Sequence, residues 1–249
     1  MVAADSGLEQ LFADLGDWAG EHTVPVATQA YGADRDQHAD IRTVEGAHGV
    51  ALVLHGGFWR AAYGKEIMDA ASIALAGAGW TTWNVEYRRV GAGGGWPRTF
   101  DDVAAAAGAA AAAHDRVAAI GHSAGGHLAL VLASQALVDC AVALGAVCDL
   151  HAAAADRLGD GAVLAFMAGT SEEAWADADP LRRAPPPVPV ALVHGVDDDT
   201  VPISQARAYR DAAAGRATLV ELDCGHFEPI DPRSDAWPHV VRALAEVGG

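Results

Sequence analysis

Lysine is nearly absent from this sequence: Lys65 is the only one, and every other basic residue is arginine. The 16 basic residues are outnumbered by 33 acidic ones, so the formal net charge is −17 at pH 7. Nucleic acids and anionic membrane surfaces attract basic patches, so this charge argues against both as partners. The use of arginine in place of lysine, together with abundant alanine and glycine, indicates a genomic composition bias. Adaptation to high salt is a weaker explanation of the same acidity.

Disulfides, membrane spans and zinc motifs are also missing. Cys140, Cys148 and Cys224 are odd in number and irregularly spaced, and no C-x-x-C motif occurs, which predicts reduced thiols. No histidine pair has H-E-x-x-H spacing. The N-terminus lacks the basic start and apolar run of a signal peptide, and the alanine run at 104–113 is too weakly apolar to span a membrane. We therefore expect a cytoplasmic protein with no metal and no membrane attachment.

The composition is otherwise that of a folded α/β protein, because 51% of the residues are hydrophobic and apolar strand-like runs alternate with helical segments. This alternation predicts a mostly parallel central sheet with helices on both faces, in one domain over residues 1–249. The least regular stretch, about 145–188, is the candidate for a small cap insertion. The expected strands are 40–44 (an edge strand), 50–54, 80–85, 117–120, 140–144, 188–194 and 217–222. The expected helices are 6–18 (capped by Ser6), 65–78, 100–114 (capped by Thr99), 123–136, 203–214 and 234–246.

The stretch GHSAGG, residues 121–126, surrounds Ser123 with small residues. In a chain with 28 glycines a G-x-S-x-G match alone is weak. Here, however, an apolar strand precedes the serine and a helical segment follows it, which is the arrangement of a nucleophile elbow. The sharp turn lifts the hydroxyl above the end of the sheet, and the glycines allow close chain approach. We therefore predict that Ser123 is a nucleophile.

A serine nucleophile needs a base, and in this arrangement the chain order is serine, acid, histidine. We assign the base to His226, in the loop after the last expected strand. The other histidines fit less well: His122 adjoins the nucleophile, His127 and His239 lie inside helices, and His55 and His194 lie at strand ends and are expected to brace loops.

The acid comes from HGVDDDTVP, residues 194–202, where three aspartates are consecutive. Adjacent loop side chains point in different directions, so only one should reach the base. The pattern H-G-x-x-D-x-x-V-P places the acid at Asp198, with Asp197 and Asp199 in a solvated turn. Asp149, after the preceding strand, is a further candidate.

The oxyanion of a tetrahedral intermediate needs preorganised donors. One is expected to be the backbone amide of Ala124, the residue after the nucleophile. The others should come from the loop HGGFW at 55–59, where glycines let amides turn toward the site. We favour the amides of Gly57 and Phe58, with Gly56 supplying the turn.

HGGFW, GHSAGG, HGVDDDTVP and CGHFEP occur in the order found in α/β-hydrolases, and HGGFW resembles the H-G-G-x-W signature of the kynurenine formamidase (arylformamidase) branch and related small esterases. The resemblance extends from about Val50 to the C-terminus, whereas the first 40 residues contain no matching motif. It implies the α/β-hydrolase fold and a cofactor-independent serine hydrolase. It also implies that Ser123, Asp198 and His226 form the catalytic triad.

Several other residues are candidates for the substrate pocket. Phe58, Trp59 and Trp96 lie in loops expected near the catalytic end of the sheet and could stack on an aryl group, although packing of the loops is the simpler role for Trp59. Four arginines could bind a substrate carboxylate, but surface ion pairing is the commoner role. They are Arg60, Arg88, Arg89 and Arg98. Cys224 lies near His226 and is expected to be a small buried filler.

The sequence thus predicts a hydrolase of a small ester or amide that acts through an acyl-enzyme, with an arylformamidase acting on a substrate such as N-formylkynurenine as the specific hypothesis. A broad-range short-chain carboxylesterase is the main alternative. An inactive hydrolase fold used as a binding module and an acyltransferase remain open. The expected partner is a small molecule, and the oligomeric state, a homodimer included, is left open.

Overall fold

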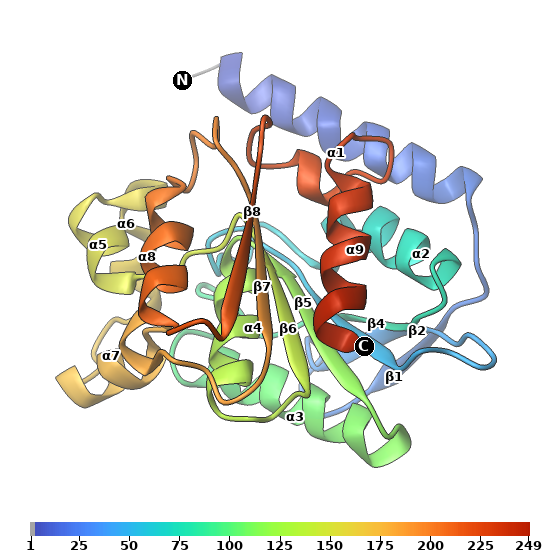
Figure 1. Cartoon of the computed structure of the whole chain (residues 1–249), viewed down its shortest axis with the longest axis horizontal. Coiled ribbons are helices and arrows are strands. Elements are labelled where there is room, and N and C mark those ends of the chain that lie inside the picture. The colour runs from blue at the N-terminus through green and yellow to red at the C-terminus, as the bar shows by residue number, and fades with distance from the viewer. Residues whose placement is uncertain (1–2) are drawn as a thin grey trace.

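A computed structural model describes residues 3–249, and it contains one eight-stranded sheet with the strand order β1-β2-β4-β3-β5-β6-β7-β8 (Figure 1). Strands β3 to β8 are parallel, and β1 and β2 are added in antiparallel fashion beside β4. The strands are β1 (Ala27–Ala30), β2 (His38–Arg42), β3 (Val50–Leu54), β4 (Thr81–Val85), β5 (Val117–His122), β6 (Cys140–Leu144), β7 (Val190–Gly195) and β8 (Ala217–Leu222). Every residue of β3 to β7 is buried, as expected for parallel strands covered on both faces.

Helices cover both faces of the sheet, which confirms the predicted architecture. Figure 1 shows α2 and α9 on one side of the sheet and α4 and α8 on the other. Two hydrophobic clusters fill these layers: one packs under α3, α4 and α8, and the other packs under α1, α2 and α9. The bounds are α1 (Ala3–Glu21), η1 (Lys65–Met68), α2 (Asp69–Gly77), α3 (Arg98–Ala113), α4 (Ala124–Ser134), α8 (Ser204–Ala212), η3 (Glu228–Ile230) and α9 (Trp237–Gly248).

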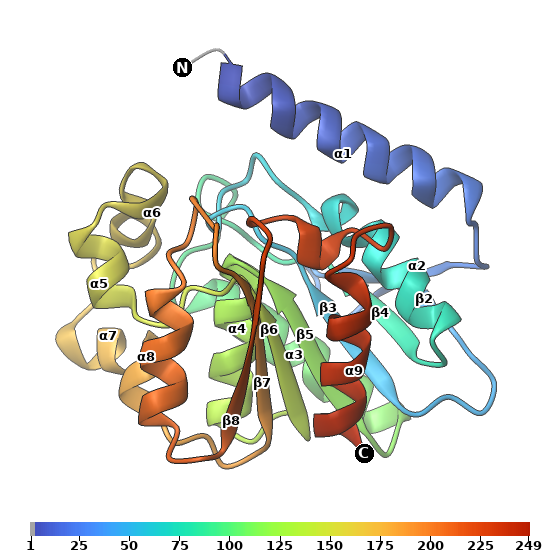
Figure 2. The same ribbon diagram turned by 45° about the horizontal axis from the view of Figure 1, so that its top comes forward.

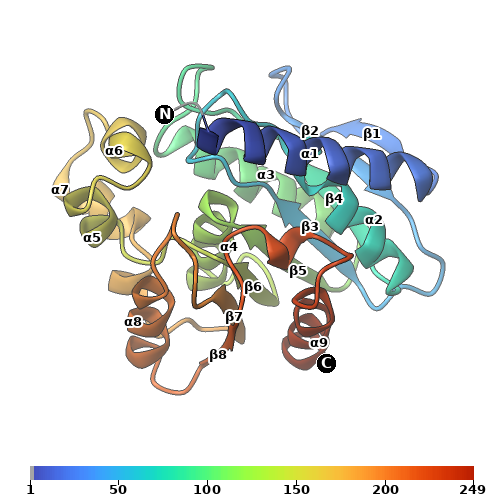
Figure 3. The same ribbon diagram turned by 90° about the horizontal axis from the view of Figure 1, so that it is seen from above.

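The segment expected to be least regular forms short helices. They are α5 (Leu150–Ala155), α6 (Leu158–Phe166), α7 (Glu172–Ala178) and η2 (Leu181–Arg183). In all three views α5, α6 and α7 lie together at the side of the molecule next to α8 (Figures 1–3). Asp149 caps α5 by accepting a hydrogen bond from the Ala152 amide at 2.9 Å, so this carboxylate has a structural partner away from His226.

The N-terminal helix α1 crosses the top of the molecule above α2 and α9 (Figure 2), and Figure 3 shows it lying over the strand ends. It begins at Ala3, so Ser6 lies inside the helix and the prediction of a cap at Ser6 is wrong. Residues 1–2, which belong to the stretch used to argue against a signal peptide, lie outside the described residues. No helix within residues 3–249 is both long and apolar enough to cross a membrane.

Two further expectations about local structure are wrong. The strand expected at the sheet edge, β2, is covered by β1, a four-residue strand whose side chains are all exposed. Thr99 does not cap α3, because the helix starts one residue earlier. Its hydroxyl instead donates to the Arg88 carbonyl at 2.6 Å and accepts from the Gly95 amide at 3.0 Å, so it ties together the glycine-rich loop before the helix.

Candidate active site

Ser123 occupies the sharp turn between β5 and α4. Its backbone has φ 55° and ψ −116°, a conformation that L-residues rarely adopt and that surrounding structure must hold in place. The Ser123 amide donates to the Leu144 carbonyl at 2.8 Å and thereby fastens the turn to β6. A Cβ on Gly121 would lie 2.1 Å from the Gly125 carbonyl oxygen, and a Cβ on Gly125 would lie 2.2 Å from that of Leu54. Glycine is therefore required at both positions of this motif.

His226 and Asp198 are joined by a short hydrogen bond from His226 Nδ1 to Asp198 Oδ2, at 2.7 Å. Asp198 is supplied by the loop after β7, and His226 by the loop after β8. The other carboxylate oxygen, Oδ1, accepts from the amides of Thr200 (2.9 Å) and Val201 (2.7 Å). Both side chains are buried, so the pair is shielded from water. The bond at Nδ1 leaves Nε2 as the nitrogen that can accept a proton.

His194, expected to brace a loop, holds the loop that carries Asp198. Its Nε2 donates to the Val201 carbonyl at 2.8 Å and lies 3.2 Å from Asp198 Oδ2. Burial alone would raise the pKa of Asp198, but the hydrogen bonds from His194 and His226 outweigh it and hold this pKa well below its usual range. Asp198 is therefore a carboxylate at any working pH. Asp197 and Asp199 are exposed.

The loop after β3 has an unusual backbone at the residues expected to bind an oxyanion. Gly57, Phe58 and Trp59 have φ values of 99°, 52° and 56°. Gly56 packs against the elbow, because a Cβ there would lie 3.1 Å from Ser123 Cβ. No backbone carbonyl within residues 3–249 accepts a hydrogen bond from the amides of Gly57 or Phe58. These amides are thus free to bind an oxyanion.

A cavity of about 790 Å³ opens over these groups, and Ser123, His226, Gly57 and Phe58 all line it. Across the part of the chain that the structure describes, Ser123 Oγ forms no hydrogen bond, to His226 or to any other residue. Catalytic hydrogen bonds are often long in unliganded sites and tighten when substrate binds. The structure thus brings Ser123, His226 and the loop after β3 to one cavity, with no hydrogen bond formed between Ser123 and His226.

The N-terminal helix forms one wall of this cavity, through Gly7, Leu8, Leu11 and Phe12. The Phe12 ring meets the ring of Phe227 edge-on, with the centroids 5.7 Å apart, directly beside His226. Sequence reasoning missed this role. The spacing of the apolar residues predicted the helix, but nothing in that spacing showed which part of the molecule the helix would cover.

Two predicted pocket residues lie elsewhere. Trp59 is fully buried and stacks on Phe166, with ring centroids 4.5 Å apart. Packing is therefore its role, and the pocket assignment is wrong. Trp96 stacks on Phe100 and lines a separate open groove with Thr170 and Ser171, so its assignment to the substrate pocket is also wrong. Tyr63 and Phe227 supply aromatic surface in the cavity instead.

The candidate arginines divide between the cavity and ion pairs. Arg60 lines the cavity and donates to the Gly159 carbonyl at the start of α6. Arg88 pairs with Asp102, and Arg89 pairs with Asp36 and Glu86. Arg98 does not line the cavity.

The remaining histidines and Cys224 are not placed for proton transfer. His122 Nε2 donates to the His226 carbonyl at 3.0 Å, and burial lowers the His122 pKa to about 3, so the ring stays neutral. His127 Nε2 donates to the Ala178 carbonyl at 2.8 Å, and burial lowers its pKa to about 4. Burial, with nearby carboxylates, raises the pKa of the half-buried Cys224 thiol to about 11.

Gly145, at the end of β6, packs directly against the acid–base pair. A Cβ there would lie 3.1 Å from His226 Nδ1 and 3.2 Å from Asp198 Oδ2. We expect Gly145→Ala to lower kcat on the order of 10²-fold, the cost of misplacing a catalytic group by about 1 Å. Gly46→Ala is the matched control, because Gly46 also has positive φ (67°, against 51° at Gly145) but a Cβ there would meet nothing within 4 Å. Equal losses of kcat in the two variants would show that backbone strain alone is responsible.

The fold and the elbow define the class to which this protein belongs, the α/β-hydrolase fold. The sequence profile of the prolyl oligopeptidase family matches residues 69–224, more than half of the chain, and the chain therefore belongs to that family. The match includes Ser123 and Asp198, but it does not extend to His226, the HGGFW loop or α1. A search of curated proteins found no match.

Solved structures with the same fold cover nearly the whole chain. A proposed thioesterase from Silicibacter sp. TM1040 has a TM-score of 0.77 at 20% identity, covering 98% of this chain and 95% of that one. An esterase from Pyrobaculum calidifontis has a TM-score of 0.75 at 19% identity (98% and 92% covered). Esterase B from Lactobacillus rhamnosis, in complex with a tributyrin phosphonate, has a TM-score of 0.73 at 18% identity (97% and 91% covered). At such low identities these similarities establish the fold.

Proposed function

We propose that this protein is a serine hydrolase of small esters. The observation that carries the proposal is the convergence of four chain segments at one cavity: the strained turn at Ser123, the loops after β7 and β8 that supply the His226–Asp198 pair joined at 2.7 Å, and the loop after β3 with its free amides. Esterase activity is named for two of the solved structures of the same fold, which supports the carboxylesterase hypothesis over the arylformamidase hypothesis.

In the proposed mechanism His226 Nε2 removes the proton from the Ser123 hydroxyl as Oγ attacks the ester carbonyl carbon. The ionised Asp198 holds the imidazole with Nδ1 protonated and stabilises the imidazolium that forms. The amides of Gly57, Phe58 and Ala124 donate to the developing oxyanion. His226 then gives its proton to the leaving alkoxide, and water attacks the acyl-enzyme with His226 again acting as base.

Covalent labelling tests the proposal directly. A fluorophosphonate probe should label the wild-type protein at Ser123, as shown by peptide mass spectrometry. A chain that is not labelled and hydrolyses no p-nitrophenyl ester would be an inactive hydrolase fold. Product analysis with added alcohols separates hydrolysis from acyl transfer, because a transferase gives the new ester instead of the free acid.

The acyl group that fits the cavity should be short. Phe58 lies directly after the oxyanion glycine, while Leu11 and Phe12 close the cavity from above. We therefore expect kcat/KM for p-nitrophenyl esters to fall beyond butyrate. A long apolar channel would instead add about 0.8 kcal/mol of binding per methylene that fits. A rise in kcat/KM from acetate to decanoate would contradict this prediction.

Arylformamidase activity is the second candidate, and the aromatic lining of the cavity favours it. Phe12, Phe58, Tyr63 and Phe227 all line the space above Ser123, and such rings suit an aryl leaving group. Comparison of kcat/KM for formanilide and for phenyl acetate distinguishes the two activities. A kcat/KM for formanilide within about tenfold of that for phenyl acetate would support the formamidase, because the same catalytic residues would then cleave the amide nearly as well as the ester.

A further inference from the structure

The loop between β3 and η1, residues 55–64, carries two of the proposed oxyanion donors and has a strained backbone beside the cavity. Three consecutive residues, Gly57 to Trp59, have positive φ, and two of them are not glycine. Such a backbone persists only where the surrounding structure over-determines it. The groups that hold the two ends of this loop are therefore expected to control the direction of its amides.

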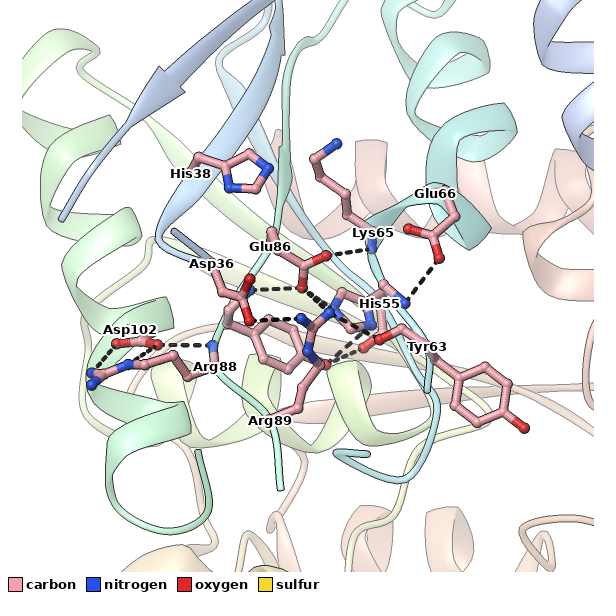
Figure 4. Close-up of polar contacts among 12 residues, drawn as sticks. Asp36, His38, His55, Tyr63, Lys65, Glu66, Glu86, Arg88, Arg89 and Asp102 are labelled. Carbon is pink, nitrogen blue, oxygen red and sulfur yellow. Dashed lines mark hydrogen bonds and ion pairs between the residues drawn. The ribbon is translucent and has the colours of Figure 1, made fainter. Parts of the chain in front are cut away.

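One buried carboxylate, that of Glu86, contacts both ends of this loop (Figure 4). Glu86 directly follows β4 and is 7% exposed. At the start of the loop, His55 Nε2 lies 3.1 Å from Glu86 Oε1. At its end, the Lys65 amide donates to Glu86 Oε2 at 3.1 Å. Oε1 also accepts from Arg89 Nη1 and from the Tyr87 amide (3.0 Å).

Neighbouring groups extend these contacts along the loop. His55 Nδ1 donates to the Gly56 carbonyl at 2.8 Å, so the ring that contacts Glu86 also orients the peptide before Gly57. Tyr87 stacks on His55 with ring centroids 4.2 Å apart and donates its hydroxyl to the His55 carbonyl at 2.6 Å. Arg89 Nη1, besides pairing with Glu86, donates to the Tyr63 carbonyl at 2.9 Å, near the end of the loop.

Glu86 is ionised throughout the range in which an esterase would be assayed. Burial by itself raises the pKa of this carboxyl, but the hydrogen bond and charge of His55, together with Arg89, lower it to about 2. A carboxylate accepts at both oxygens and donates at neither. Glu86 can therefore satisfy the donors at both ends of the loop at once, which no neutral side chain of the same shape can do.

We propose that Glu86 is a positioning residue of the active site: by holding His55 at one end and the Lys65 amide at the other, its carboxylate fixes the Gly57 and Phe58 amides in the direction that binds the oxyanion. Glu86 does not touch the substrate and acts through the loop. This inference rests on the proposed hydrolase function, because it assigns these amides to the oxyanion.

Glu86→Gln is the primary test, since it keeps the size of the side chain but replaces one acceptor oxygen with a donor. The amide nitrogen must face either the Lys65 amide or the donors around His55 and Arg89, so one end of the loop loses its bond. We expect kcat for p-nitrophenyl acetate to fall about 10- to 100-fold with KM changed by less than about threefold. The loss is smaller than the 10²- to 10³-fold that follows removal of an oxyanion donor.

Asp102→Asn is the matched control, because Asp102 is another buried carboxylate; Figure 4 shows it next to Arg88. It pairs with Arg88 at 2.6 Å and accepts from Gln37, and it bonds no residue of the loop. Both substitutions disrupt a buried ion pair and should lower the Tm. Only Glu86→Gln should weaken inhibition by a trifluoromethyl ketone, which forms an oxyanion on the enzyme, and this loss should parallel the loss of kcat/KM.

A second pair of variants tests one contact of Glu86 without changing its carboxylate: one variant removes the contact, and the other is its control. Lys65 is the first residue of η1 after the extended Gly64, a position that proline tolerates. Lys65→Pro deletes the amide that donates to Glu86 Oε2, and Lys65→Met keeps it while removing the same ion pair with Asp40. We expect Lys65→Pro to lower kcat several-fold relative to Lys65→Met. This pair tests the proposal even if Glu86→Gln fails to fold.

The outcomes separate this inference from the proposed function. An active wild type whose Glu86→Gln and Lys65→Pro variants match Asp102→Asn and Lys65→Met in kcat and in ketone inhibition would overturn the role of Glu86 and leave the hydrolase intact. A parallel loss of kcat and Tm in both buried-carboxylate variants, with unchanged ketone affinity, would also overturn it. A wild type that no fluorophosphonate labels would overturn the proposed function itself.

Discussion

Ser123→Ala is expected to lose about 10⁴- to 10⁶-fold in kcat, as removal of a triad nucleophile does. The proposed acyl-enzyme forms at Ser123 Oγ, and none of the neighbouring side chains offers a substitute. His122 is held to the His226 carbonyl, and Cys224 has a thiol whose pKa is raised to about 11, so neither replaces the hydroxyl. The measurement is kcat for p-nitrophenyl acetate together with fluorophosphonate labelling.

The stability of this variant should change little, which makes the test clean. The alanine keeps the Cβ and hence the same strained φ of 55°, and within the described residues the Ser123 hydroxyl forms no hydrogen bond that would be lost. Ser134→Ala is the control and should keep full activity and labelling. Ser134 is the last residue of α4, the helix that begins directly after Ser123. If Ser123→Ala retains more than a few per cent of wild-type kcat in a preparation free of contaminating esterase, the proposed mechanism is wrong.

The parts of the site whose geometry depends on residues close together in the chain could be predicted from the sequence. A turn such as GHSAGG encodes its own geometry, because Gly121 and Gly125 are required by contacts of 2.1 and 2.2 Å that any Cβ would make. The spacing H-G-x-x-D-x-x-V-P similarly indicates which aspartate faces inward: the amide of Val201, three residues on, donates to Asp198. Such features depend on residues close together in the chain.

Features that depend on contacts between segments far apart in the sequence could not be predicted from it. The four residues of β1 alternate too weakly to predict a strand, because all four are exposed and only pairing with β2 orders them. The apolar residues of α1 predict a helix equally well whether it covers the core or the active site. Glu86, an acidic residue just after a buried strand, resembles a solvated loop position until the fold brings to it His55, from the loop after β3, and Lys65, from η1.

Asp198→Asn is expected to lose roughly 10³- to 10⁴-fold in kcat, the second largest effect predicted for this protein. The carboxylate receives donors on both sides: the amides of Thr200 and Val201 at Oδ1, and His226 with His194 at Oδ2. An asparagine there can keep its oxygen on the two amides, and its NH₂ group then faces the imidazole. His226 must accept at Nδ1 and carry its proton on Nε2, where it cannot take the proton from Ser123.

Asp197→Asn and Asp199→Asn are matched controls, because they make the same chemical change one residue to either side. Both aspartates are exposed, and neither carboxylate contacts His226 in the structure, so each variant should stay within about threefold of wild-type kcat, the size of a surface-charge effect. Asp199 lines the cavity, so its variant also shows whether a charge at the rim affects KM. A crippling loss in either control, with Asp198→Asn near wild type, would mean that the acid had been assigned to the wrong aspartate. A large loss confined to Asp198→Asn would show that the bond to His226 Nδ1 sets the tautomer on which proton transfer depends.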